Sequence, residues 1–169
     1  MTCRTNFDSE CEILINKQIN MELNAFYFYL NLSSLFNNEK ISLKNISNFF
    51  KKQSTEELGH AQKWIDYLNQ RGGVVQLYVI NKPIDIQAKY FTESFETSLK
   101  LEKEIHNNLL KLHKFASSKQ DEHLCDFIES EFLTEQVKSQ REFMDFIVNA
   151  KRCDSNLGIY LFDKNMNKN

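Results

Sequence analysis

Glu57 and His60 stand three residues apart in a stretch of helical periodicity, so both side chains lie on one face of a helix. A carboxylate and an imidazole in that arrangement can bind one metal ion. The same spacing also arises by chance on solvated helices. Taken alone, the pair is therefore better explained as part of an exposed helix surface than as a metal site. Glu22 and Glu102 change this interpretation, because each interrupts the apolar stripe of another expected helix.

Three inward carboxylates are costly to bury, since an unpaired buried charge must be neutralised by a proton or by a partner. No lysine or arginine occupies a matching inward position on these stripes. A bound cation is the natural compensation. Because the donors are carboxylate oxygens and one imidazole, without a thiolate, the site favours iron or manganese over structural zinc.

The last long helix offers no second pair of this kind and instead presents Glu135 and Gln136. One of two metal positions would then be rich in carboxylates and lack imidazole. We therefore expect an asymmetric, weakly held pair of ions. Such a pair suits a site that oxidises iron and passes it on better than one that retains a permanent di-iron cofactor.

Helices must position these side chains, because the 169-residue chain contains only four glycines and one proline. The proline, Pro83, lies in an extended connection, residues 72–91, that is long enough to cross a bundle. The fold class is all-α, an up-down-down-up four-helix bundle with one long crossover and a short fifth helix, which is apolar nearly all round and should be buried. Within a single domain, 1–169, the helices are predicted at about 9–37, 42–71, 92–117, 121–151 and 156–164.

Composition excludes several classes of protein. The formal net charge of -2 gives no basic field for nucleic acid. The longest apolar run, Ala25 to Leu30, is too short to span a bilayer, and the first residues lack an apolar segment. Four cysteines without a C-x-x-C pair fit free thiols in a reducing compartment. We predict a cytoplasmic protein with no membrane or nucleic-acid partner.

Several segments, in order along almost the whole chain, resemble animal ferritin of the heavy-chain type. They are Gln18–Leu23, Gln53–Ala61, Asn69–Gly73, Leu101–Lys103, His123–Glu129 and Tyr160–Lys164. The resemblance implies a ferritin-like bundle and a cage of twenty-four subunits. The cage is either a homo-oligomer or a mixed cage that includes other ferritin chains as partners. It also implies storage of iron as a ferric mineral, with ferrous iron and dioxygen as substrates.

The resemblance further implies a ferroxidase centre that binds two iron ions (Fe2+/Fe3+) per subunit. One iron position matches Glu22, Glu57 and His60; the other matches Glu57, Glu102, Gln136 and Glu56. Tyr29 matches the tyrosine beside that centre, and is otherwise an aromatic core residue. Asp126 and Glu129 match the acidic lining of the three-fold pores, where repeated carboxylates would attract ferrous ions.

Two departures from the heavy-chain pattern carry consequences. Gly59 and Gln62 occupy positions where heavy chains usually have cavity-facing acids, which predicts weak mineral nucleation. The link at 153–156 is shorter than usual, which alters the expected four-fold pore.

We interpret the chain as an iron-storage and detoxification enzyme, a ferroxidase. The first alternative is a non-enzymatic shell subunit that binds mineral and depends on partner chains for oxidation; the complete ligand set argues against it. The second is a helical signalling protein of the cytokine kind. Such bundles have two long crossovers, whereas this sequence predicts one.

Overall fold

The computed structural model describes residues 3–86 and 91–166, and within these ranges the regular structure is entirely helical. In chain order the elements are α1 (Ser9–Asn37), α2 (Lys44–Gln70), α3 (Phe91–Ser118), α4 (Glu122–Ile128), a π-helical turn (Glu129–Leu133), α5 (Thr134–Ala150) and α6 (Asn156–Asn165). The predicted all-α class is confirmed.

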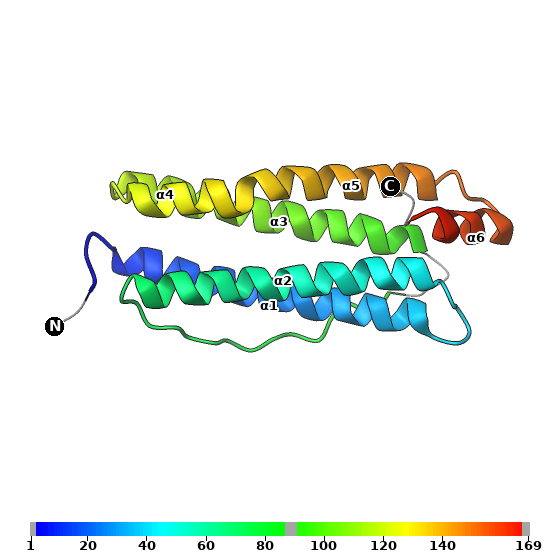
Figure 1. The fold of residues 1–169 in the computed structure, drawn as a ribbon, viewed down its shortest axis with the longest axis horizontal. Coiled ribbons are helices and arrows are strands. Elements are labelled where there is room, and N and C mark those ends of the chain that lie inside the picture. Colours follow the sequence, from blue (N-terminus) through cyan, green and yellow to red (C-terminus); the bar gives the residue numbers. More distant parts are fainter. Residues whose placement is uncertain (1–2, 87–90, 167–169) are drawn as a thin grey trace.

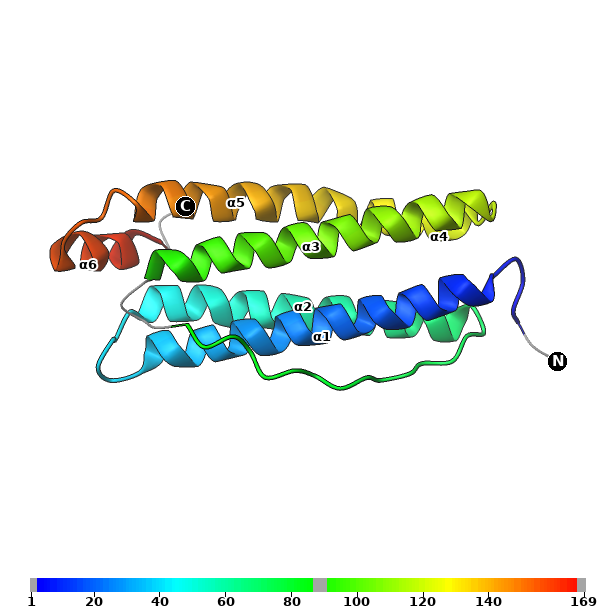
Figure 2. The same ribbon diagram turned by 180° about the vertical axis from the view of Figure 1, so that it is seen from behind.

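Two antiparallel pairs of helices lie side by side and form the bundle (Figure 1). The first pair is α1 with α2; in the second, α3 packs against the continuous column of α4, the π-helical turn and α5. The extended crossover runs along the outside of the first pair, so α3 starts at the end of the bundle where α2 starts (Figure 2). Residues 87–90 of the predicted crossover lie outside the described part.

An asparagine ladder on α1 holds the crossover. Asn16 donates to the Val74 carbonyl at 2.9 Å, and Asn20 donates to the Val79 carbonyl at 3.1 Å. Asn24 accepts from the Asn81 amide at 2.9 Å. The three asparagines are spaced by four residues and therefore follow one face of α1. They satisfy backbone groups that an extended segment cannot pair within itself.

The second helix begins two residues later than the predicted Ser42, because Ser42 has a φ of 51° and cannot belong to a right-handed helix. Leu43, at the N-cap, offers no side-chain hydrogen bond. Asp163 of α6 supplies the cap instead: its Oδ1 accepts from the amides of Asn45 and Ile46, both at 2.9 Å. This contact fixes α6 against the start of α2.

The predicted continuous helix 121–151 is wrong in one respect, because the π-helical turn Glu129–Leu133 interrupts it. Buried positions here advance in steps of four, through Leu124, Ile128, Phe132 and Gln136. In an α-helix of 3.6 residues per turn, each such step rotates the side chain by about 40°. The wider π turn compensates for this drift and keeps Phe132 and Gln136 facing the core.

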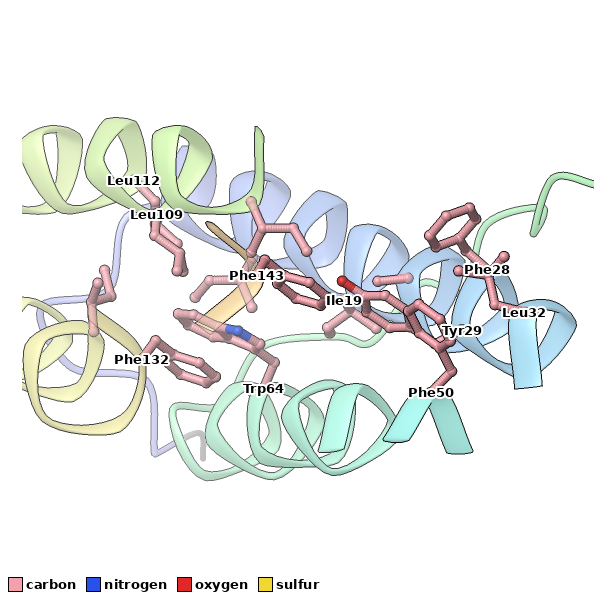
Figure 3. Packing of buried hydrophobic residues seen from close by; sticks show 14 of the residues in the cluster. Ile19, Phe28, Tyr29, Leu32, Phe50, Trp64, Leu109, Leu112, Phe132 and Phe143 are labelled. Carbon is pink, nitrogen blue, oxygen red and sulfur yellow. The ribbon is translucent and has the colours of Figure 1, made fainter. Parts of the chain in front are cut away.

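Aromatic rings fill much of the core (Figure 3). Tyr29 stacks against Phe50 and Phe143 at centroid distances of 6.0 and 6.1 Å. The expectation that the last helix is buried is wrong for the single subunit, because Leu157, at 65% exposure, and Tyr160, at 52%, face outward. Burial there would require a neighbouring molecule.

Candidate metal centre

Three side chains from two helices form a compact group of metal-ligand type. Glu22 comes from the middle of α1, and Glu57 and His60 come from adjacent turns of α2. One ligand atom from each residue lies within 4.8 Å of the other two. All three side chains are buried, since the apolar stripes that carry them face the bundle interior. The structure thus brings together the three residues that the resemblance assigns to one iron position.

Glu22 has one oxygen occupied and one free. Its Oε1 accepts from Gln18 Nε2 at 2.7 Å. Its Oε2 is buried and has no hydrogen-bond partner among the described residues. A buried oxygen of this kind is rare unless something else compensates it, and a cation would do so.

The opposite wall of the centre comes from α3 and α5. Tyr29 donates its phenolic proton to Glu102 Oε1 at 2.5 Å, and Gln136 Nε2 donates to Glu102 Oε2 at 2.9 Å. The Gln136 Oε1 atom is buried and, in the part of the chain described, unpartnered. These contacts orient Glu102 and leave an amide oxygen available as a second neutral ligand.

Two further acids lie at the edge of the centre. Glu135 Oε2 is 3.2 Å from His60 Nε2, whereas Glu57 Oε2 is 3.3 Å from His60 Nδ1. Glu56 is half-buried and accepts from Gln53 at 2.7 Å. A cavity of about 730 Å³ joins these groups, with Glu56 and Glu135 in its lining together with the inner residues Glu57, His60, Glu102 and Gln136. The structure therefore places Glu56 in the cavity wall, outside the compact group.

Burial raises the pKa of Glu22, Glu57 and Glu102, and neighbouring carboxylates add to the shift for Glu22 and Glu57. Without a metal, these groups tend to hold protons. Burial, together with the negative charge of Glu102, also raises the pKa of Tyr29. A divalent cation would replace the protons and satisfy the free oxygens at the same time.

Asp126 and Glu129 lie elsewhere, on the exposed side of the column formed by α4 and the π-helical turn. Glu129 Oε1 is 2.6 Å from His113 Nε2. The structure does not bring this pair to the metal centre, as expected for residues assigned to a pore.

Sequence reasoning missed Gln18 and His113. Gln18 stands four residues before Glu22, a spacing at which side chains on one helix meet, so this contact was visible in principle. His113 reaches Glu129 from a different helix, and spacing alone gives no signal for it.

The ferritin-like domain family matches residues 13–153 of the chain. Over 164 residues the chain is 44% identical to "Ferritin, middle subunit" of Aquarana catesbeiana, a match that covers 95% of this chain and 93% of that protein. The chain belongs to the ferritin family. It is also 45% identical over 161 residues to "Soma ferritin" of Lymnaea stagnalis, covering 95% of this chain and 92% of that ferritin.

Membership of this family confirms the predicted resemblance to animal ferritin and implies iron storage. Within the described ranges, none of the helices combines the length and the apolarity needed to cross a membrane.

Proposed function

We propose that this ferritin is of the heavy-chain type and oxidises ferrous iron with dioxygen inside each subunit. The observation that carries the proposal is a pair of buried oxygens, Glu22 Oε2 on α1 and Gln136 Oε1 on α5, that have no hydrogen-bond partner among the described residues. Both atoms are acceptors in a group of buried carboxylates, so a bound cation would compensate them together.

Two ferrous ions are the substrates. One would bind Glu22, Glu57 and His60, and the other Glu57, Glu102 and Gln136, with Glu56 receiving ions at the cavity wall. Each ion gives one electron to dioxygen, which takes up two protons and becomes hydrogen peroxide. Gln136 is uncharged, so the second position holds its ferric product weakly and releases it. Tyr29 keeps Glu102 oriented through its hydrogen bond.

Assembly into a cage of twenty-four subunits accounts for apolar side chains that a single subunit leaves exposed. On the crossover, Leu77 is 67% and Val79 is 80% exposed, and on α6 Leu157 is 65% exposed. Large apolar side chains left exposed on the crossover and on α6 fit burial against neighbouring subunits. The cage is a homo-oligomer or includes other ferritin chains, stores ferric mineral in its cavity and lies in the cytoplasm, with Asp126 and Glu129 lining its entry pores.

The decisive experiment is aerobic oxidation of ferrous iron by the double variant Glu57→Lys with His60→Gly. The introduced ammonium would occupy the place of a metal and compensate the remaining acids, so the variant should assemble but lose rapid oxidation. Glu104→Lys, which makes the same charge change at an exposed position of α3, is the matched control and should retain it.

Gel filtration of each variant reports whether the assembly survives. An unchanged initial rate in the double variant would show that the site is assigned wrongly. Slow oxidation by the wild-type protein, in an intact cage, would favour the non-enzymatic shell subunit.

A further inference from the structure

A line of aromatic rings leads from the metal centre to the surface of the subunit. The His60 ring lies 5.6 Å from Phe132, edge to face. Phe132 in turn stacks on Trp64, with centroids 4.7 Å apart and planes inclined by 6°. Figure 3 shows Trp64 projecting from α2 and lying against Phe132. Trp64 has no exposed surface, so its indole is shielded from solvent.

From Trp64 the line continues outward through Tyr67. The two rings are 6.2 Å apart, and Phe127 packs against both, at 5.1 Å from Trp64 and 4.1 Å from Tyr67. Tyr67 is 3% exposed, whereas His123, which stacks on it at 5.7 Å, is exposed. The line therefore ends at solvent.

Trp64 and Tyr67 differ in what happens to their protons. The Trp64 indole nitrogen is buried and finds no acceptor among the described residues, so a tryptophan oxidised there keeps its proton. Tyr67 has its phenolic oxygen 3.2 Å from His123 Nδ1, which accepts the phenolic proton when the ring carries its own proton on Nε2. Arg71 donates to the same phenolic oxygen.

Tyrosine and tryptophan are among the side chains most easily oxidised by one electron. A tyrosine that can lose its proton at the same time is the better donor of the two. Burial raises the pKa of Tyr67 to about 12, so its phenol carries a proton at neutral pH. The order of the residues thus favours electron flow inward, from Tyr67 through Trp64 to the centre.

We propose that Trp64 and Tyr67 form an electron-transfer path that removes excess oxidising equivalents from the iron centre. This function rests on the proposed ferroxidase activity, which forms hydrogen peroxide. A further ferrous ion in the centre gives one electron to the peroxide, which splits into hydroxide and an oxidant at the level of the hydroxyl radical.

That oxidant takes one electron from Trp64 and one proton from solvent and becomes water. The oxidised Trp64 takes one electron from Tyr67, whose proton passes to His123. A small one-electron reductant in solution, such as a thiolate, approaches the exposed His123 ring and gives an electron to the Tyr67 radical behind it, and the proton returns from His123. The carboxylate ligands are thereby spared from oxidation.

Tyr29 competes for the same role, because it touches Glu102 directly. The test must therefore identify the oxidised residue. Ferrous iron is mixed with air-saturated buffer and then with hydrogen peroxide, and samples are frozen rapidly for electron paramagnetic resonance. Parallel samples are digested for mass spectrometry of Trp64, the only tryptophan in the chain. Iron oxidation is followed by absorbance in the same samples.

We expect a tyrosyl radical in the wild type that is lost in Tyr67→Phe and in Trp64→Phe. It should persist in the control Tyr78→Phe, which removes the hydroxyl of an exposed tyrosine on the crossover. In Tyr67→Phe the oxidising equivalent stops at Trp64, so hydroxylated tryptophan should increase. Both substitutions keep an aromatic side chain and are checked for assembly by gel filtration, and Trp64 fluorescence in Tyr67→Phe reports on the surrounding core.

Iron oxidation without a radical, or with a radical that persists in Tyr67→Phe and disappears in Tyr29→Phe, would overturn the path. Absence of iron oxidation in the wild type would instead overturn the proposed ferroxidase function, so the two failures are distinguishable.

Discussion

Substitutions at Gly59 can distinguish two properties of α2 that could affect iron storage, the stability of the helix and the charge of its surface. It lies in the helix interior with an exposed backbone, and a Cβ added there would meet no atom of the described residues within 4 Å. Gly59→Ala should therefore stabilise the subunit by about 1 kcal/mol through helix propensity alone. For a chain of this size, that corresponds to an increase of roughly 2–4 °C in Tm.

Acidic substitutions at Gly59 and Gln62 add negative charge to α2 but should stabilise it less than Gly59→Ala does. Gln62 donates to Asp66 Oδ1 at 2.8 Å, so Gln62→Glu breaks this bond and sets two like charges four residues apart. That repulsion costs about 0.2–0.5 kcal/mol. The double variant Gly59→Glu with Gln62→Glu should consequently be less stable than Gly59→Ala, while it presents two more anionic anchors beside Glu56 and Asp66.

The assay follows iron loading after the first ions per subunit have been oxidised, when growth of the mineral sets the absorbance change. If anionic anchors limit nucleation, the double acid variant accelerates this phase, and Gly59→Ala behaves like the wild type. Unfolding of the metal-free protein in denaturant gives the order of stability independently. Acceleration by Gly59→Ala equal to that of the double acid variant would refute the charge argument and assign the effect to helix stiffness.

Three other perturbations have expected outcomes. Asp163→Ala removes the cap of α2 and should lower the unfolding free energy by about 1–2 kcal/mol, with faster hydrogen exchange in the first turn of α2; Asp154→Ala is the control, and unchanged exchange would contradict the cap. Burial raises the pKa of Glu57, so its contribution to metal-free stability is complete below the unfolded pKa of about 4.3 and is lost as the pH rises through the higher folded value. The free energy of unfolding in denaturant should therefore be lower at about pH 8 than at about pH 5, and Glu57→Gln should reduce this difference. An equal difference in the variant would exclude Glu57 as its source. Asp126→Asn with Glu129→Gln should slow iron uptake and weaken its dependence on salt, because steering by charge is screened; uptake unchanged at low salt would contradict the pore.

The helices and the burial of the inward acids could be predicted because both follow from one periodicity. Glu22 and Glu102 interrupt apolar stripes most of whose other members are buried, so their burial could be expected from the sequence. The π-helical turn could not be predicted this way, because the pattern was interpreted with a constant 3.6 residues per turn. Its signal was the run of three successive steps of four from Leu124 to Gln136, over which the side chains of a regular α-helix would rotate by about 120°.

Contacts between distant segments were inaccessible for a different reason. The cap of α2 comes from Asp163, 118 residues away from Asn45 in the chain, and the partner of Tyr67 is His123, 56 residues away. Neither contact leaves a periodic pattern. The asparagine ladder is intermediate, since the spacing of Asn16, Asn20 and Asn24 is visible but the backbone that they bind is not.

Asp163 and Glu22 show why a buried acid is not by itself a sign of a metal centre. Both are nearly inaccessible, at 5% and 1% exposure, and both stand in helices with apolar neighbours. Asp163 meets backbone amides and the Asn45 side chain, so both of its oxygens have donors and its burial serves the fold. Glu22 keeps one oxygen without a donor in the described part of the chain, and so does the Gln136 amide across the bundle. The unsatisfied oxygen therefore separates Glu22 from Asp163. Glu102 has donors to both of its oxygens, and only its place in the cavity lining associates it with the centre.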